Sequence, residues 1–267
     1  MASFDFDQAE GLRRMLAGPR PRVITFVSAA SQAEKNAMLV NLGASLANTV
    51  HDVLLLDAQK TGSGIASRLR AGRGVTLQDV CQRKRALQDA VHETDQGFRV
   101  ASFGQFTQRA TGDSRKEEKL DDAFGSLAKE MDVMLVDAEL DENGEFPIAS
   151  FASGEIVMQV SADAASIKSA YALVKQLNAK LGKRPYGILV TGTSEKGAQR
   201  VYANMAQAAS RYLAVQLQFI GFIPADEHLV QAARLGRTVI DAFPMAHASV
   251  AFRSLAGRFA SSAAVMA

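Results

Sequence analysis

The sequence predicts an α/β fold with a doubly wound, mostly parallel sheet flanked by helices. Short aliphatic runs, such as residues 23–27 (VITFV) and 53–56 (VLLL), alternate with longer stretches of helical spacing. Near-continuous apolar runs of this length are typical of strands covered on both faces, and alternating strand and helix units imply right-handed crossovers. The regular spacing predicts one α/β domain over residues 21–267, preceded by a separate segment of residues 1–20.

The composition fits this fold class and excludes several others. The 267 residues carry 30 Lys and Arg against 28 Asp and Glu, and 48% of them are apolar, which excludes disordered and collagen-like chains. A net charge of +2 gives no basis for binding nucleic acid through bulk electrostatics. Cys81 is alone, so no disulfide or cysteine-built metal site is expected within the chain. Since no signal peptide and no membrane-spanning run is recognisable, a cytoplasmic location is expected.

The apolar and helical patterns give the elements in order. The expected strands are residues 23–27, 53–56, 98–102, 133–136, 156–160, 187–190 and 218–223. The expected helices are residues 35–50, 119–130, 164–181, 195–212, 227–235 and 246–260. Residues 108–119 (QRATGDSRKEEK) are polar and lack periodicity, so a solvated surface loop is expected there.

The N-terminal segment predicts a short amphipathic helix. Asp5 or Asp7 can cap it, and Leu12, Met15 and Leu16 share one face. A helix this short is marginal alone, so it must dock on something. Two interpretations remain open: it folds back on its own domain, or it enters a groove on another protein.

The first strand leads into a helix at the place where nucleotide-binding α/β proteins carry a phosphate loop. That loop needs glycines, because its backbone N–H groups must converge on phosphate oxygens without a Cβ in the way. Here residues 29–34 (AASQAE) contain no glycine, Lys35 stands at the lysine position and Asn36 replaces the hydroxyl residue. Glu34 would add a carboxylate beside the phosphates. The strand–loop–helix arrangement therefore matches that of a phosphate-loop protein, whereas the loop sequence does not.

Acidic residues follow two of the expected strands. Asp57 and Asp137 stand at strand ends, where an aspartate can order magnesium, so Asp137 is the candidate metal ligand if Mg²⁺ is bound. The structural alternative is that each carboxylate caps the following turn. Because Glu139 and Asp141 add further negative charge beside Lys60, such a cleft is expected to handle a triphosphate poorly.

Four motifs, in this order along the chain, carry a family resemblance. They are DQAEGLR at residues 7–13, VLLLD at 53–57, SIKSAYALVK at 166–175 and GFIPAD at 221–226. On these motifs the chain resembles the MinD/ParA-type P-loop ATPases and, within them, the flagellar number regulators of the FlhG/FleN branch. The resemblance extends almost from end to end and implies a MinD-like fold. It also implies the residues of a nucleotide site, if any is retained: Lys35, Asn36, Asp57, Asp137, Pro224 and Asp226.

The departures from that family concern the nucleotide site. The family's GKGGVGKT loop corresponds to AASQAEKN at residues 29–36, so the lysine that bridges ATP-bound dimers is replaced by Ala30. The family's second acid after strand two is replaced by Gln59, and Thr191 stands where the family has an adenine-facing Asn. Since loss of one oxyanion-type donor already costs about 2.7–4 kcal/mol in tested enzymes, we expect no catalysis and no bound cofactor.

The resemblance implies a regulator of flagellar number or placement that acts through its N-terminal helix. This helix would engage a flagellar signal-recognition-type (FlhF-like) GTPase through Asp7, Gln8, Ala9, Leu12, Arg13 and Leu16. Flagellar switch or C-ring proteins and a flagellar transcription activator are further implied partners, and recruitment to the cell pole or the inner-membrane face is an implied location. Two alternatives remain: an active, MgATP-dependent switch with an atypical loop, and a ParA-like positioning protein for another polar machine.

The last helical pattern places Phe252, Leu255 and Phe259 on one face. This predicts a helix that closes the core, with weak or absent membrane contact, because the tail after it is short and uncharged.

Overall fold

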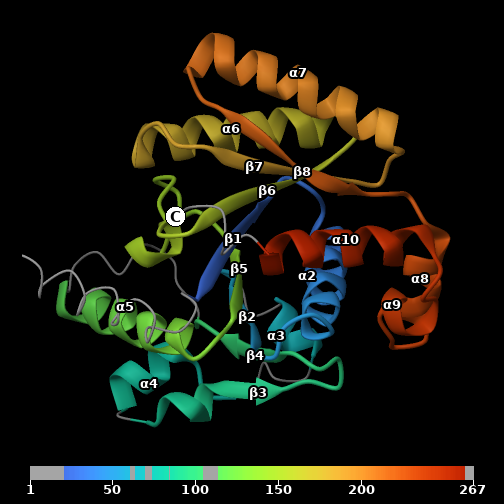
Figure 1. Cartoon of the computed structure of the whole chain (residues 1–267). Coiled ribbons are helices and arrows are strands. Elements are labelled where there is room, and N and C mark those ends of the chain that lie inside the picture. Colours follow the sequence, from blue (N-terminus) through green and yellow to red (C-terminus); the bar gives the residue numbers. More distant parts are fainter. Residues whose placement is uncertain (1–20, 61–63, 70–73, 84, 105–113, 262–267) are drawn as a thin grey trace, which may run out of the picture.

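Eight strands form one sheet in the computed structural model, which describes residues 21–60, 64–69, 74–83, 85–104 and 114–261. Their order is β3-β4-β2-β5-β1-β6-β7-β8. They are β1 (Arg22–Ser28), β2 (Val53–Ala58), β3 (Val91–Glu93), β4 (Arg99–Ser102), β5 (Val133–Ala138), β6 (Glu155–Ser161), β7 (Tyr186–Thr191) and β8 (Leu217–Ile223). All neighbours pair in parallel except β3 and β4, which run antiparallel (Figure 1). The predicted fold class is therefore confirmed.

Helices connect the strands in the predicted order. The longer ones are α2 (Gln32–Ala47), α5 (Ser114–Lys129), α6 (Ala164–Leu181), α7 (Glu195–Leu213), α8 (Glu227–Arg234) and α10 (His247–Ser261). The shorter ones are α3 (Ile65–Arg68), α4 (Leu77–Arg83), α9 (Val239–Ala242) and the 3₁₀ turns at Leu87–Ala90 and Ala149–Ala152. Among the described residues, none of these helices is long and apolar enough to cross a bilayer.

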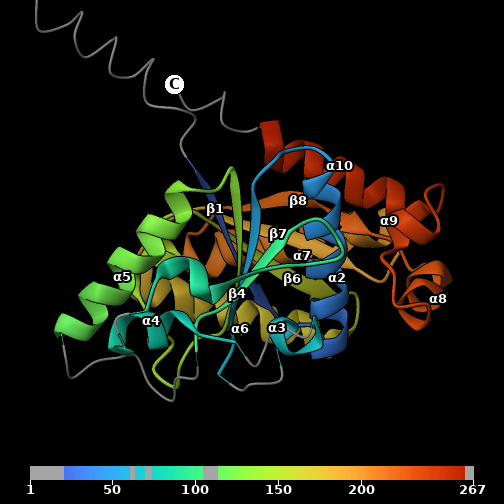
Figure 2. The ribbon, with the colours of Figure 1, turned by 90° about the horizontal axis from the view of Figure 1, so that it is seen from below.

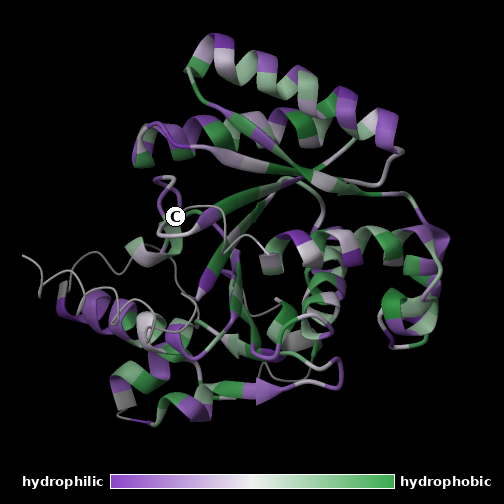
Figure 3. Cartoon of the chain, viewed as in Figure 1, coloured by the Kyte–Doolittle hydropathy of each residue, from purple (hydrophilic) through white to green (hydrophobic). Residues whose placement is uncertain are grey.

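Helices cover both faces of the sheet, because successive side chains of a strand point to opposite sides. Leu55 of β2 packs in a core layer with α2, α9 and α10, whereas Leu54 and Leu56 pack in a layer with α4, α5, α6 and α7. Figure 2 shows α5 on one side of the strands and α2 with α10 on the other. Apolar residues line the strands and the inner helix faces, and the outward face of α7 is largely hydrophilic (Figure 3).

The last helix packs as predicted. Phe252, Leu255 and Phe259 of α10 are buried against the sheet and α2, and the Phe259 ring meets Phe26 of β1 edge to face. An apolar stripe at this spacing covers the core and leaves the opposite face of the helix exposed.

Two expectations from the sequence differ from the structure. Residues 108–113 lie outside the described part, but residues 114–119 are the first turns of α5, so the predicted loop is wrong there. The Arg, Lys and Glu residues of this stretch are good helix formers, and they need no apolar periodicity where they face solvent. In addition, α2 begins at Gln32 rather than near Lys35, because Ser31 caps it. The separate segment of residues 1–20 stays a prediction, since it lies outside the described residues.

Candidate functional site

The turn between β1 and α2 is shorter than a phosphate loop. After β1 ends at Ser28, only Ala29, Ala30 and the cap Ser31 precede the helix. The backbone N–H of Lys35 donates to the Ser31 carbonyl at 2.9 Å, as in any first helical turn. In a phosphate loop this N–H and its neighbours stay free of the helix and converge on phosphate oxygens. Here Gln32 and Glu34, which stand at two of the loop's glycine positions, are part of α2.

Glu34 occupies the N-terminus of α2 as part of a capping box. The N–H of Glu34 donates to the Ser31 hydroxyl at 3.3 Å, and the N–H of Ser31 donates back to Glu34 Oε2 at 3.1 Å. The hydroxyl of Ser161, at the end of β6, lies 3.4 Å from both carboxylate oxygens of Glu34. A helix N-terminus favours an anion because its N–H groups and dipole are positive there. This protein supplies that anion from its own chain.

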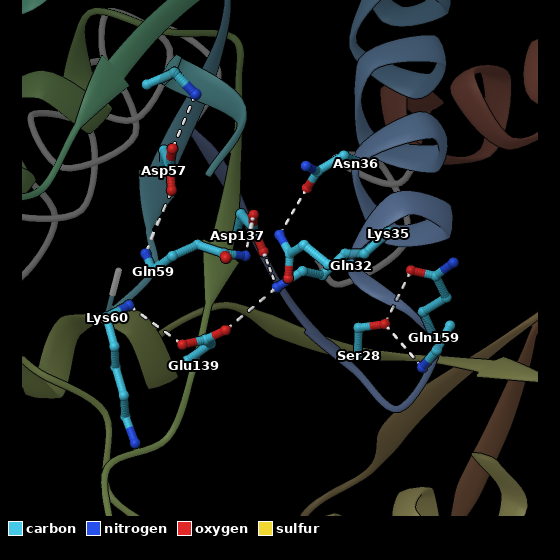
Figure 4. A network of polar contacts seen from close by, with 12 residues as sticks. Ser28, Gln32, Lys35, Asn36, Asp57, Gln59, Lys60, Asp137, Glu139 and Gln159 are labelled. Atoms are coloured by element: carbon cyan, nitrogen blue, oxygen red, sulfur yellow. Dashed lines mark hydrogen bonds and ion pairs between the residues drawn. The ribbon is translucent and has the colours of Figure 1, made fainter. Parts of the chain in front are cut away.

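The ammonium of Lys35 is engaged by carboxylates of β5 and the residues after it (Figure 4). Its Nζ lies 2.9 Å from Asp137 Oδ1 and 3.9 Å from Glu139 Oε1. Only 4% of the Lys35 side chain and 0% of the Asp137 side chain are exposed, so this is a buried ion pair. Gln59 donates its side-chain amide to Asp137 Oδ2 at 2.7 Å, and the backbone N–H of Lys60 donates to Glu139 at 3.2 Å.

Burial changes the proton affinity of both strand-end aspartates. It raises the pKa of Asp137 to about 6, even though Lys35 and the Gln59 amide favour the ionised form. Burial also raises the pKa of Asp57, while the N–H groups of Ala66 and Gln59 oppose this. Asp57 Oδ2 accepts the Ala66 N–H at 2.9 Å, so its carboxylate binds the first turn of α3. This is the capping role that the sequence left open.

The remaining predicted nucleotide residues lie in two places. Asn36 is buried on α2, where its side-chain oxygen accepts from Gln32 at 2.9 Å. Pro224 follows β8 and lines a groove beside α10. Asp226 accepts the N–H of His228 at the start of α8 and the N–H of Ala248 in α10, both at 3.0 Å.

Asp226 therefore caps two helices at once, which the sequence did not predict. Burial opposes its ionisation, but the N–H groups of Ala248 and His228 and the His228 ring at 2.7 Å together lower the pKa of Asp226. The structure brings Lys35, Asn36, Asp57 and Asp137 to one edge of the sheet, and places Asp226 in the α8–α10 region instead.

A row of polar side chains inside the sheet was missed from the sequence. The Ser28 hydroxyl donates to Gln159 Oε1 at 3.2 Å, and the Gln159 amide lies 3.4 Å from the Thr191 hydroxyl across β6 and β7. The signal was the single glutamine within the apolar run of residues 156–160. Ser28 and Gln159 lie at the same edge of the sheet as Asp137 and near Lys35 (Figure 4).

The cavity beside this network has a volume of about 320 Å³ and is lined by Ser28, Gln32, Lys35, Lys60, Glu139 and Asp141. Asp141 turns back into its own loop and accepts the N–H groups of Asn143 and Glu145, both at 2.9 Å. Within the described ranges no three His, Cys, Asp or Glu side chains are grouped to hold a metal ion. The predicted partner residues Asp7, Gln8, Ala9, Leu12, Arg13 and Leu16 lie outside the described residues.

Similar proteins agree with the fold and the sequence motifs. No family model matches the chain. The antiactivator FleN of Pseudomonas aeruginosa is 29% identical over 237 residues, covering 88% of this chain and 85% of its own. An uncharacterized ATP-binding protein of Methanocaldococcus jannaschii is 24% identical over 236 residues, covering 88% of this chain and 86% of its own.

Solved structures show the same fold. The MinD cell division protein of Aquifex aeolicus superposes with a TM-score of 0.65 at 20% identity, over 89% of this chain and 95% of its own. The septum site-determining protein MinD of Pyrococcus horikoshii, complexed with Mg-ADP, gives a TM-score of 0.65 at 19% identity, over 92% of this chain and 98% of its own. The resemblance to the MinD/ParA-type ATPases, on the branch that includes FleN, is thus confirmed.

Proposed function

We propose that this protein regulates flagellar number or placement and does so without binding a nucleotide. The observation that carries the second half of the proposal is the buried Lys35–Asp137 ion pair at 2.9 Å. The similarity to FleN, a protein named as an antiactivator, supports the first half.

Binding a triphosphate would break two internal interactions and add one repulsion. Moving Lys35 onto a phosphate leaves Asp137 as a buried carboxylate without its cation, which costs about 3–5 kcal/mol when such pairs are broken by mutation. Unwinding the first turn of α2 loses the Ser31 cap, worth about 1 kcal/mol. Glu34 then faces the phosphates with like charge. A loss of ~4 kcal/mol weakens a micromolar affinity to the millimolar range.

Calorimetric titration of the full chain with MgATP and MgADP tests this proposal. The MinD protein of Pyrococcus horikoshii, which has the same fold and was solved in complex with Mg-ADP, serves as the positive control. We expect no binding at nucleotide concentrations up to about 1 mM. Micromolar binding would overturn the proposal and favour the MgATP-dependent switch.

We further propose that the N-terminal segment engages a signal-recognition-type GTPase of the flagellar system. The support is that residues 7–13 (DQAEGLR) keep the motif of the flagellar branch, whereas residues 29–36 (AASQAEKN) have lost the phosphate-loop motif. The test measures GTP hydrolysis by this GTPase with the full chain added. Several-fold stimulation is expected, with its loss in Leu12→Asp and its retention in Tyr212→Asp, a matched change at a 68% exposed apolar residue of α7. Absence of stimulation by the unmodified chain would contradict this proposal and leave a ParA-like role in another polar machine.

A flagellar transcription activator is a second proposed partner, because FleN is named as an antiactivator. Co-purification of the activator with the full chain in nucleotide-free buffer is the expected result. Complex formation that requires ATP would contradict a nucleotide-independent role.

A further inference from the structure

A groove runs along the open edge of the sheet, between β8 and α10. Its volume is about 620 Å³. One side is formed by residues 219–222 of β8, and Pro224 lies near one end. The half-buried rings of Phe219 and Phe222 pack on the α7 side of the sheet, with Phe219 against Tyr202, so β8 borders the groove with its free edge. Figure 1 shows α10 lying alongside β8, which is the last strand of the sheet.

The other wall is a single stripe of α10. His247, Val250, Ser254 and Arg258 all line the groove, and they follow one another at spacings of three or four residues. Residues at these spacings share one face of a helix. Val250 is 53% exposed although it is a large aliphatic residue. The stripe is therefore a helix face that nothing among the described residues fully covers.

The N-terminal segment joins the domain at one end of this groove. Arg22, the first residue of β1, donates its guanidinium to the carbonyls of Arg258 at 3.1 Å and of Phe259, and it lies over the Phe259 ring at 5.3 Å. Arg258 itself lines the groove and donates to the carbonyls of Phe219 and Ile220 at 2.9 and 3.1 Å. Both ribbon views place the last turn of α10 near the start of β1 (Figures 1 and 2).

The length of the preceding segment matches the length of the groove. The groove follows α10 from His247 to Arg258, which is about 18 Å at a rise of ~1.5 Å per residue. A helix over residues 5–16 has the same number of residues and therefore the same length of about 18 Å. The five residues 17–21 between this helix and β1 can span up to ~16 Å when extended, enough to turn into the groove.

We propose that residues 5–16 of this chain dock as a helix in the groove between β8 and α10, with Leu12, Met15 and Leu16 facing Val250 and the free edge of β8. The apolar face of the segment is then covered by its own domain. The same face carries Leu12 of the predicted partner motif, so docking and partner binding compete for it. This regulatory consequence rests on the proposed function, whereas the docking itself does not.

Hydrogen–deuterium exchange of the full chain tests the docking. We expect the amides of residues 8–16 to exchange at least tenfold more slowly than in a free peptide of residues 1–20. Val250→Asp places a charge on an exposed position of the groove, so folding is preserved and the protection should fall to less than twofold. Leu12→Asp should have the same effect, and Tyr212→Asp, at an exposed apolar residue outside the groove, should have none.

Three outcomes would overturn this proposal. The first is exchange of residues 8–16 at the free-peptide rate in the unmodified chain. The second is protection that Val250→Asp leaves unchanged, which places the segment elsewhere. The third is protection that increases with protein concentration, which identifies a second copy as the occupant. Because this readout involves no GTPase, its result is independent of the stimulation assay.

Discussion

The Lys35–Asp137 ion pair allows a prediction in which the effect of one substitution depends on pH. Lys35→Met keeps most of the side-chain volume and removes the cation that lies 2.9 Å from Asp137. The Asp137 carboxyl has a pKa of about 6, so at pH 5 it is mostly protonated and the ion pair is mostly absent. At pH 8 the carboxyl is ionised, and the substitution removes its counter-ion.

The size of this pH-dependent destabilisation follows from the difference between the pH and the pKa of Asp137. At pH 8 the carboxyl lies two units above about 6, and at ~1.36 kcal/mol per unit its ionisation beside Lys35 is worth roughly 2.7 kcal/mol. If the carboxyl of the variant stays protonated at pH 8, this amount is lost. The destabilisation by Lys35→Met should therefore be about 2.7 kcal/mol larger at pH 8 than at pH 5.

Urea unfolding followed by far-UV circular dichroism at pH 5, 6, 7 and 8 measures this difference. The matched control is Lys180→Met, because Lys180 forms an exposed ion pair with Glu145 at 3.0 Å, with 40% and 28% of the side chains exposed. The control should cost less than about 1 kcal/mol at every pH. An equal loss for Lys35→Met at pH 5 and pH 8 would refute the assignment of a buried, charged pair.

Three further predictions concern the stability of the fold. Ser31→Ala should lower the free energy of unfolding by about 1 kcal/mol through loss of the α2 cap, without creating ATP binding in calorimetry. Asp226→Ala should cost about 2 kcal/mol in urea unfolding, because it leaves the helix-start N–H groups of His228 and Ala248 without an acceptor. The pKa of Asp226 is lowered in the folded state, so its ionisation contributes its whole stabilisation above a pH of about 4, and this contribution is lost as the pH falls further. The variant should therefore differ less from wild type near pH 2. Tyr186→Phe should be neutral or stabilising by up to about 1 kcal/mol in thermal melts, because its buried hydroxyl has no hydrogen-bond partner among the described residues; a loss above 1 kcal/mol would indicate a hidden partner.

The strands and long helices could be predicted because their apolar patterns are strong. The bounds of α6 at Ala164–Leu181 follow directly from the sequence, since its helical periodicity begins after the cap Asp163 and ends at Gly182. In contrast, β3 has only three residues, Val91–Glu93, and none of them is fully buried. A strand that short has no periodicity to detect, and its pairing with β4 depends on tertiary contacts.

The sequence was sufficient to predict which residues gather at the site, but not which of them bond to one another. That Lys35, Asp57 and Asp137 gather at one edge follows from the parallel pairing of β1, β2 and β5, which all end there. Which acid takes the lysine depends on side-chain direction, and Asp57 instead binds the backbone of Ala66. The double cap of Asp226 could not be seen, because Ala248 is 22 residues away in the chain.

The winding of the β1–α2 turn into helix has a consequence for timing. In a protein that is switched by ATP, the hydrolysis rate sets the lifetime of the ATP-bound state, and the ratio of ATP to ADP in the cell sets how much of the protein is in that state. Here the groups that would contact the γ-phosphate bond to other groups of the same chain: Lys35 to Asp137, and the N–H of Ser31 to Glu34. Because these contacts are intramolecular, the nucleotide concentration in the cell does not change them. If the chain binds no nucleotide, as proposed, its output is set by how many copies are present and by which partner holds them. Control of this regulator then lies in its synthesis and degradation rather than in a catalytic cycle.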